Sequence, residues 1–306
     1  MSTTPIFDVA ETARLIPFRP LIEALKIAAA DYAAGRMVNP ERLAVPLNDD
    51  GIMLSMPAAA HDLAIHKLVN ICPRNAERAM PTIFGQVMAF DADTGKTLFI
   101  LDGPTVTGRR TAAMSMLGVE TFSRTTPKEF LLIGTGVQAA NHLQAIGELY
   151  PEARVRVKGL TDAFARSFVD AQKGKARNLE PLTDTTIPDS IDVVIMLTTS
   201  HKAVYNEAPR AGRLVIGMGA FTPEMCEIGA RTIGGSSLYV DDLAGARHEA
   251  GDFIQAGVDW ATVKGIKDAV ANTPALDKPV VFKTVGCAAW DLAAGRVARS
   301  TLDSGK

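Results

Sequence analysis

The amino-acid sequence predicts an α/β protein in which a doubly wound parallel sheet is joined to a separate α+β domain. From Glu129 onward, short β-type runs alternate with helical stretches, the pattern of a parallel sheet covered on both faces. A glycine-rich turn follows the first of these runs. The first 118 residues differ, because Pro and Gly punctuate their short extended pieces.

Six strands are expected in the parallel sheet, a number that suits a doubly wound fold. Strands buried on both faces should be almost wholly apolar, as the run from Val193 to Leu197 is. The six runs are Phe130–Ile133, Arg154–Val157, Asp192–Leu197, Arg213–Gly217, Leu238–Val240 and Val280–Phe282. We assign residues 119–284 to this domain.

The α+β domain is expected to open with an amphipathic helix over Leu21–Ala34, which Gly35 ends. Extended pieces follow around Leu43–Leu47, Ile52–Met56, Lys67–Cys72 and Gln86–Asp91. The stretch from Cys287 to Leu302 is helical and comes after the last strand of the sheet, so it could return to the first domain. We therefore assign residues 1–118 and 285–306 to the α+β domain.

Length and charge favour a two-domain protein that acts on a small molecule. The chain of 306 residues exceeds the roughly 100–200 residues of one typical domain. Its net charge is −2, and no block of Lys and Arg lies on a tail or a helix face, so we expect no nucleic-acid partner. No apolar run approaches the roughly 20 residues that a bilayer requires, which indicates a cytoplasmic protein with no membrane partner.

The cysteines and histidines indicate neither a disulfide framework nor a metal site. Cys72, Cys226 and Cys287 are far apart and odd in number, so we expect buried free thiols. The five histidines show no spacing that is typical of metal ligands, and we expect no metal.

The turn after the first predicted strand carries the G-x-G-x-x-A fingerprint of a Rossmann dinucleotide site. Gly134 permits the tight turn, Gly136 lets the backbone approach a pyrophosphate, and Ala139 allows the helix to lie close to the strand. Amides at the helix N-terminus then face the phosphates. The sequence therefore predicts a nicotinamide-dependent oxidoreductase. The residues expected to hold the dinucleotide here are Gly134, Thr135, Gly136, Val137 and Gln138.

The end of the second predicted strand favours NADPH over NADH. An NAD-preferring site usually carries an acidic residue there, roughly 20 residues beyond the glycines, which binds the ribose 2′-hydroxyl. No carboxylate occupies Gly159 or Leu160, whereas Arg156, Lys158 and Thr161 could hold a 2′-phosphate. The alternative is that these are solvated charges and that NADH binds as well.

Two more strand ends are candidates for cofactor contacts, since ligands of open α/β sheets lie beyond the carboxyl ends of the strands. They carry Thr198, Thr199, Ser200, Gly217 and Met218. Hydroxyls and glycines are also common in ordinary turns. Asp241 and Asp242, after the fifth strand, are expected to be solvated turn residues.

Seven pieces of the sequence, in order, match a known family. They are Met56–Ala58, Lys67–Asn70 with Asn75, Thr107–Ala113, Gly134–Gln138, Leu197–Ser200, Pro223 with Glu227, and Lys283–Gly286 with Asp291. On these pieces the chain resembles the ornithine cyclodeaminase/mu-crystallin family along nearly its whole length. Within the family it is most similar to the bacterial Δ1-pyrroline-2-carboxylate/Δ1-piperideine-2-carboxylate reductases, especially at Leu101–Arg110 and Gly286–Asp291.

The resemblance implies a homodimer whose first domain supplies the subunit contacts and the substrate pocket. It also implies that Arg42, Lys67 and Arg110 grip the carboxylate of a small cyclic imino acid, with Lys67 as the catalytic residue. Charge-assisted bonds suit this task, since an Arg fork can bind both carboxylate oxygens. The cofactor contacts that the resemblance adds are Arg110, Thr111, Lys283 and Gly286.

The activity that the resemblance implies is NAD(P)H-dependent reduction of a ketimine, from Δ1-pyrroline-2-carboxylate to L-proline and from Δ1-piperideine-2-carboxylate to L-pipecolate. Cyclodeaminases of the family carry an acid/base Asp where this chain has Phe221, and Phe cannot transfer protons. The alternatives are an alanine-type amino-acid dehydrogenase, an ornithine cyclodeaminase, and an NADPH-dependent ligand-binding protein like mu-crystallin.

Overall fold

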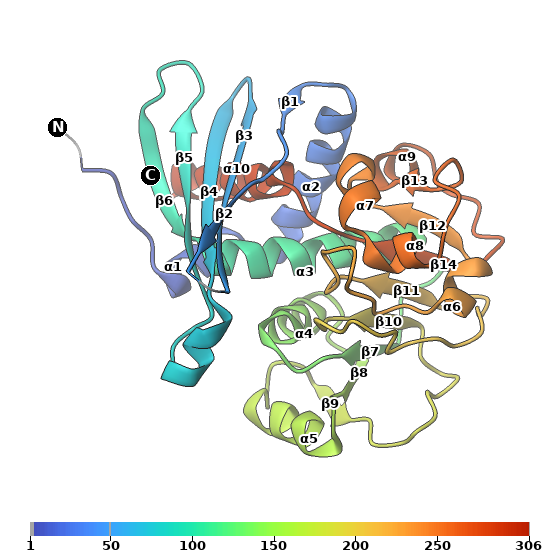
Figure 1. Cartoon of the computed structure of the whole chain (residues 1–306). Helices are drawn as coiled ribbons and strands as arrows, with labels where there is room; N and C mark the ends of the chain where they lie inside the picture. The colour runs from blue at the N-terminus through green and yellow to red at the C-terminus, as the bar shows by residue number, and fades with distance from the viewer. Residues whose placement is uncertain (1–2, 49, 306) are drawn as a thin grey trace. The chain divides into compact units, whose positions relative to one another are not determined.

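The computed structural model describes residues 3–48 and 50–305, and its backbone divides into two compact units (Figure 1). Unit 1 runs up to Arg110 and resumes at Cys287, and unit 2 is Thr111–Gly286. The chain passes from unit 1 to unit 2 within one helix, α3 (Gly103–Phe122). The domain boundary that the sequence suggested, after residue 118, lies inside this same helix.

Unit 1 contains a six-stranded antiparallel sheet of order β1-β3-β4-β5-β6, with β2 also paired to β3. The strands are β1 (Met37–Val38), β2 (Leu43–Leu47), β3 (Gly51–Ala60), β4 (Leu63–Ile71), β5 (Ile83–Asp91) and β6 (Thr97–Asp102). A 3-10 helix, η1 (Pro73–Arg78), connects β4 to β5. Burial alternates along β4, so that Leu63, Ile65, Lys67 and Val69 share its buried face.

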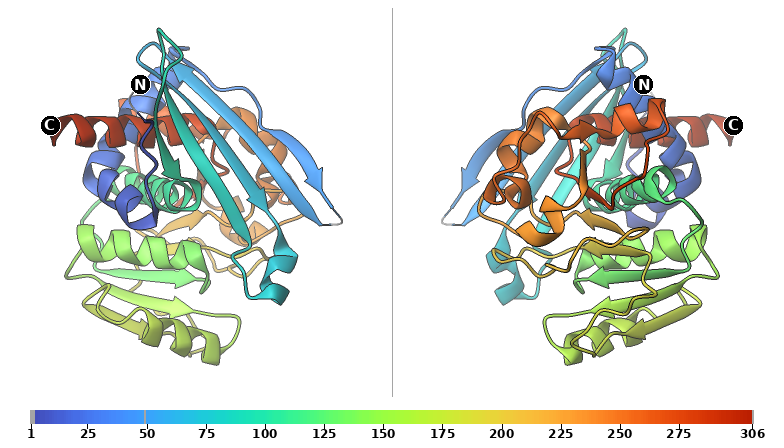
Figure 2. Two further views of the ribbon diagram at one scale, coloured as in Figure 1. Left: turned by 90° about the vertical axis from the view of Figure 1, so that its left-hand side faces the viewer. Right: turned by 90° about the vertical axis from the view of Figure 1, so that its right-hand side faces the viewer.

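The helices of unit 1 cover this buried face. They are α1 (Val9–Leu15), α2 (Phe18–Ala33) and the C-terminal helix α10 (Ala288–Ser304), and α2 and α10 pack side by side (Figure 2). A Cβ at Gly295 of α10 would lie 3.1 Å from Ile65 Cγ2 and 3.2 Å from Leu63 Cδ2. The lack of a side chain at Gly295 therefore brings the backbone of α10 close to β4.

Unit 2 contains the doubly wound parallel sheet that the sequence predicts, but with eight strands and not the expected six, in the order β13-β12-β14-β11-β10-β7-β8-β9. The strands are β7 (Glu129–Ile133), β8 (Arg154–Lys158), β9 (Asn178–Pro181), β10 (Val193–Met196), β11 (Leu214–Gly217), β12 (Ser237–Val240), β13 (Lys264–Gly265) and β14 (Val280–Lys283). All neighbouring pairs are parallel. The carboxyl ends of β8, β7, β10, β11 and β14 therefore follow one another along one edge of the sheet.

Helices lie in the connections from β7 to β8, β8 to β9, β11 to β12, β12 to β13 and β13 to β14 (Figure 1). They are α4 (Val137–Leu149), α5 (Asp162–Ala171), α6 (Ala230–Gly234), α7 (Leu243–Glu249), α8 (Gly251–Gln255) and α9 (Ile266–Ala271). The last part of α3 also packs on the sheet, because a Cβ at Gly118 would lie 2.6 Å from the Phe282 ring. Strands β7, β10, β11 and β14 are buried at every position, as expected for a sheet covered on both faces.

Membrane-spanning helices, metal-ligand groups and disulfides are all missing from the residues that the structure describes. None of the described helices is both long and apolar enough to cross a bilayer. Across residues 3–48 and 50–305, no three His, Cys, Asp or Glu side chains are grouped so that they could hold a metal ion. The cysteines are free thiols; Cys226 and Cys287 are buried, whereas Cys72 is only partly so.

Candidate functional site

The glycine turn lies between β7 and α4, where the fingerprint requires it. Gly134 has φ +127°, and a Cβ there would lie 2.6 Å from Leu197 O, so other residues would be strained. Gly136 is the N-cap of α4 with φ −89°, and no side chain caps the helix. A Cβ at Gly136 meets no atom within 4 Å, which leaves open space beside the first amides of α4.

This arrangement fits a dinucleotide. The first amides of a helix have no partner within the helix, and an anion satisfies them. Because Gly136 supplies no capping side chain and Val137 is 74% exposed, the N-terminus of α4 is open to a pyrophosphate. The buried Ala139 lets α4 pack close behind the turn.

The end of β8 holds the residues expected to select the cofactor. Arg156 lies inside the strand, and its guanidinium group contacts the Glu129 carboxylate and lies 3.2 Å from Glu180 Oε1. Lys158 is the last residue of β8, and its ammonium group donates to Asp184 O at 3.0 Å. Thr161 accepts from Phe164 N as the N-cap of α5. Lys158 and Thr161 thus lie at the end of the strand, whereas Arg156 is held further back.

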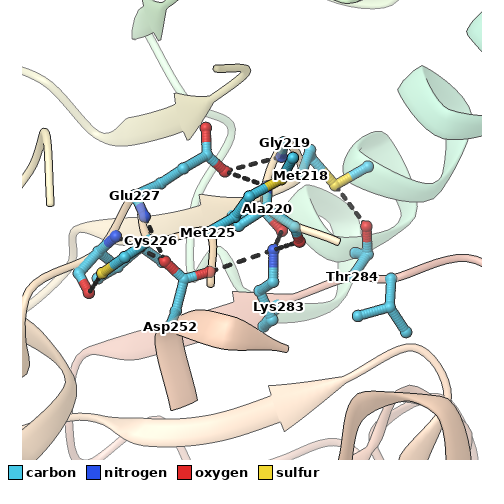
Figure 3. A network of polar contacts seen from close by, with 12 residues as sticks. Met218, Gly219, Ala220, Met225, Cys226, Glu227, Asp252, Lys283 and Thr284 are labelled. Carbon is cyan, nitrogen blue, oxygen red and sulfur yellow. Dashed lines mark hydrogen bonds and ion pairs between the residues drawn. The ribbon is translucent and has the colours of Figure 1, made fainter. Parts of the chain in front are cut away.

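The buried carboxylate of Glu227 joins the loop after β10 to the residues that follow β11, and Figure 3 shows its bonds to Gly219 and Ala220. Its Oε1 accepts from Thr198 N at 2.6 Å and from Thr198 Oγ1 at 2.9 Å. Its Oε2 accepts from Gly219 N at 2.7 Å and from Ala220 N at 3.0 Å. Burial raises the pKa of Glu227, while the Lys283 charge and the Thr198 donors oppose that rise. One side chain therefore fixes two loops that carry predicted cofactor contacts.

Asp252 and Lys283 extend this network (Figure 3). Asp252 Oδ1 accepts from the backbone amide of Glu227 at 2.5 Å, and its Oδ2 lies 3.2 Å from Lys283 Nζ. Lys283 is fully buried, and its ammonium group donates to Ala220 O at 2.5 Å and to Gly217 O at 3.4 Å. Lys283, which the family resemblance implies as a cofactor contact, thus binds the backbone of the loop after β11.

The acidic pair after β12 is not solvated, so that expectation is wrong. Asp241 is 5% exposed and Asp242 is 7% exposed. The Asp241 carboxylate accepts from Val285 N and Gly286 N, each at 2.9 Å, and so fixes the turn after β14. Gly286 has φ +77° in this turn. The sequence does not reveal that β12 and β14 are neighbours, and this pairing is what brings the donors to Asp241.

In unit 1, Lys67 and Arg110 meet at one buried carboxylate. Lys67 Nζ lies 2.6 Å from Asp291 Oδ2, and Arg110 Nε lies 3.3 Å from Asp291 Oδ1. Lys67 is 2% exposed and Asp291 is fully buried. Burial lowers the pKa of Lys67 to about 8; the Arg110 and Arg42 charges add to the lowering, and Asp291 opposes it.

Of the three cations that were expected to bind a carboxylate, Lys67 and Arg110 lie beside Asp291, and Arg42 is near enough for its charge to act on Lys67. Lys67 comes from β4, Arg110 from α3, and Arg42 from the segment before β2, where its charge acts on Lys67. A small anion bound beside Lys67 and Arg110 would gain charge-assisted hydrogen bonds.

Sequence reasoning missed Asp291, Glu227 and Asp252 as parts of these clusters. Asp291 and Glu227 stand in pieces that carry the family resemblance, but no role followed from their position. The available signal was an acidic residue in a run of apolar residues, as in the segment from Ala288 to Ala294. A carboxylate buried in this way needs donors or a cation beside it.

Comparison with known proteins gives one consistent result. The model of the ornithine cyclodeaminase/mu-crystallin family matches residues 4–306. A Δ1-pyrroline-2-carboxylate reductase of Burkholderia multivorans is 57% identical over 302 residues, 99% of this chain and 97% of that protein. A Δ1-pyrroline-2-carboxylate/Δ1-piperideine-2-carboxylate reductase of Azospirillum brasilense is 55% identical over 99% of this chain and 97% of its own length.

A solved structure shares the fold. The Δ1-pyrroline-2-carboxylate reductase of Thermococcus litoralis, determined with NADH and L-proline, superposes with a TM-score of 0.87 at 22% identity. The match covers 99% of this chain and 98% of that one.

Proposed function

Because the chain belongs to the ornithine cyclodeaminase/mu-crystallin family, we propose that it is an NAD(P)H-dependent ketimine reductase. It reduces Δ1-pyrroline-2-carboxylate to L-proline and Δ1-piperideine-2-carboxylate to L-pipecolate. The observation that carries this proposal is the 57% and 55% identity, over 99% of the chain, to reductases named for these substrates. The cationic cluster of unit 1 and the glycine turn of unit 2 are the chemical groups that such a reaction needs.

The cluster around Asp291 supplies the substrate anchor. Arg110, Arg42 and Lys67 carry the positive charge that the substrate carboxylate needs, and Arg110 offers a planar fork of donors. Binding the carboxylate fixes the position of the adjacent C2 carbon, and such positioning is a large part of catalysis when two reactants must meet.

Lys67 is the group that supplies a proton. A neutral imine is a poor hydride acceptor, and protonation of its nitrogen makes C2 electrophilic. With a pKa of about 8, Lys67 is charged at neutral pH, yet gives up a proton more readily than an exposed lysine does. The cofactor supplies the hydride from C4 of its nicotinamide ring.

NADPH is the preferred cofactor. Support comes from the strand end at Lys158, where Gly159 and Leu160 bring no carboxylate to repel a 2′-phosphate. We expect kcat/KM to be higher with NADPH than with NADH. In the Lys158→Ala variant, the difference in kcat/KM between the two cofactors should be smaller. Initial rates with both cofactors at a fixed imine concentration measure this. A clearly higher efficiency with NADH would overturn the preference.

Reduction occurs without ornithine deamination. The loop after β11 presents Phe221, 37% exposed, where a cyclodeaminase of the family carries an acid/base Asp. We expect the protein to form proline from Δ1-pyrroline-2-carboxylate and to release no ammonia from ornithine. The Phe221→Asp variant tests whether that one carboxylate adds deamination. Ammonia release by the wild type at rates matching imine reduction would reject the assignment, and turnover of pyruvate with ammonia alone would favour an alanine-type dehydrogenase.

The protein is also proposed to be a homodimer formed through unit 1. Strands β2 and β5 carry large apolar side chains that are exposed to 37% or more, and such surfaces mark interaction sites. These side chains are Leu43, Val45, Ile83 and Phe84. Light scattering should give about twice the 32.6 kDa of one chain, and Phe84→Glu should shift the mass toward a monomer. A monomeric wild type at micromolar concentration would contradict this.

A cytoplasmic location is part of the proposal. Its support is that all three cysteines are free thiols, which suits a reducing compartment. Cell fractionation with an antibody to the protein checks it.

A further inference from the structure

The close packing of α10 on β4 places one acidic side chain over Lys67. Gly295 lies opposite Leu63 and Ile65, with 3.1–3.2 Å between its Cβ position and their side chains. Asp291 lies one helical turn before Gly295 and so shares its face of α10. Lys67 follows Ile65 on the buried face of β4. The helix position that faces Lys67 is thus occupied by Asp291, 2.6 Å from the lysine nitrogen.

The surroundings of Lys67 are otherwise unfavourable to its positive charge. Burial disfavours the ammonium form, and the charges of Arg110 on α3 and Arg42 before β2 disfavour it further. Asp291 on α10 is the charged group that acts in the opposite direction. Its two oxygens face the two cations separately, Oδ2 toward Lys67 and Oδ1 toward Arg110.

We propose that Asp291 is a positioning residue of the reductase: its carboxylate holds the Lys67 ammonium group and the Arg110 guanidinium group beside each other and keeps Lys67 charged for proton transfer. This inference rests on the proposed function and assigns a role to a side chain that does not itself touch the substrate.

Asp291 supports the transfer of a proton from Lys67 to the imine nitrogen. An Nζ–H bond of Lys67 breaks and an N–H bond forms on the imine nitrogen, which leaves Lys67 neutral. The C=N bond accepts a hydride at C2 with its two electrons, so the imine is reduced and the nicotinamide is oxidised. Lys67 then regains a proton from water.

The direct test is titration of Lys67 by NMR in protein labelled with ¹³C at the lysine Cε, without substrate. The wild-type signal, assigned by its loss in Lys67→Arg, is expected to titrate near pH 8. Asp291→Asn should lower that pKa by about one unit or more, because a neighbouring negative charge is removed. Arg110→Gln should raise it. An unchanged Lys67 pKa in Asp291→Asn would overturn the proposal.

Asp62→Asn is the matched structural control. Asp62 also faces α10, where it pairs with Arg296 and Arg299, so its loss breaks ion pairs on the same helix away from Lys67. We expect Asp62→Asn to leave the Lys67 titration unchanged. Equal shifts in both variants would mean that a general loosening of α10 is responsible, and would overturn the specific role of Asp291.

The pH profile of kcat/KM gives a second readout. In the wild type, kcat/KM should fall as the pH rises past about 8. In Asp291→Asn this decrease should occur at lower pH. In Asp291→Glu, which keeps the negative charge, it should stay close to the wild-type pH. A limb in Asp291→Asn identical to that of the wild type would contradict the proposal. If the wild-type protein reduces neither imine, the proposed function is rejected. The NMR titration of Lys67 needs no substrate, so it tests the role of Asp291 independently of that outcome.

Asp291→Asn leaves two buried cations without their carboxylate and is expected to lose stability. If it does not fold, the double variant Lys67→Met with Asp291→Asn removes one of these cations and should recover folding, as measured by circular dichroism and thermal unfolding. A double variant as unfolded as the single one would show that Asp291 and Lys67 are not coupled.

Discussion

Replacing Lys67 by alanine is expected to lower kcat/KM for Δ1-pyrroline-2-carboxylate by about one to two orders of magnitude. The change removes one charge-assisted bond to the substrate carboxylate, worth roughly 1.5–3 kcal/mol, and the proton donor as well. The fold should persist, because Arg110 still faces Asp291 when Lys67 is absent. Steady-state rates of NADPH oxidation, with circular dichroism as the check on folding, measure the effect.

The matched control for this substitution is Lys96→Ala. Lys96 is an exposed lysine in the turn between β5 and β6 of the same unit, and its loss should leave kcat/KM unchanged. If Lys67→Ala is as active as Lys96→Ala, Lys67 neither binds the substrate carboxylate nor supplies the proton. Lys67→Arg separates the tasks, because it keeps the charge for the carboxylate but gives up a proton far less readily.

Replacing Gly136 by valine is expected to weaken NADPH binding by about 10- to 100-fold while the protein stays folded. The backbone at Gly136 has φ −89°, which any residue adopts, and a Cβ there meets no protein atom within 4 Å. The space that the new side chain fills is the space beside the first amides of α4. Loss of one amide-to-phosphate bond, of roughly 1.5–3 kcal/mol, accounts for the change.

Gly134 offers the contrasting substitution in the same turn. A Cβ at Gly134 would lie 2.6 Å from Leu197 O, and the backbone has φ +127°, so Gly134→Ala should lower the thermal stability of the protein itself. Fluorescence titration with NADPH and thermal unfolding without it separate the two effects. Unchanged affinity in Gly136→Val would mean that the pyrophosphate does not bind at this turn.

Hydrophobic pattern predicted the parallel sheet closely, because its central strands are buried on both faces. The six expected runs match strands to within one residue at each end. Strands β9 and β13 were missed for a physical reason. They pair at the two edges of the sheet, and β9 has the sequence Asn-Leu-Glu-Pro, which carries little apolar signal. The hydrophobic pattern of a sequence indicates which segments are buried, and strands at the edge of a sheet are only partly buried.

The candidate site was predicted less completely, because its ion pairs join distant parts of the chain. The family resemblance pointed to Lys67, but nothing in the sequence pattern pointed to Asp291 as its partner. For the same reason Asp241 was expected to be solvated, whereas it is buried against the turn after β14. Arg156 was expected at the end of its strand, yet it lies two positions before the end, beside Glu129. Sequence shows which residues are unusual, and tertiary pairing decides what they contact.

The carboxylate of Glu227 has a consequence for how this enzyme could be altered. It holds the amides of Gly219 and Ala220, so the backbone course of the first residues after β11 is set by a side chain that lies later in the same connection, before α6. The next residue, Phe221, is partly exposed and can be exchanged without disturbing those two bonds. New chemistry at position 221 can therefore be sampled one side chain at a time on an unchanged scaffold, which makes this loop a natural place for saturation mutagenesis and for divergence between related enzymes.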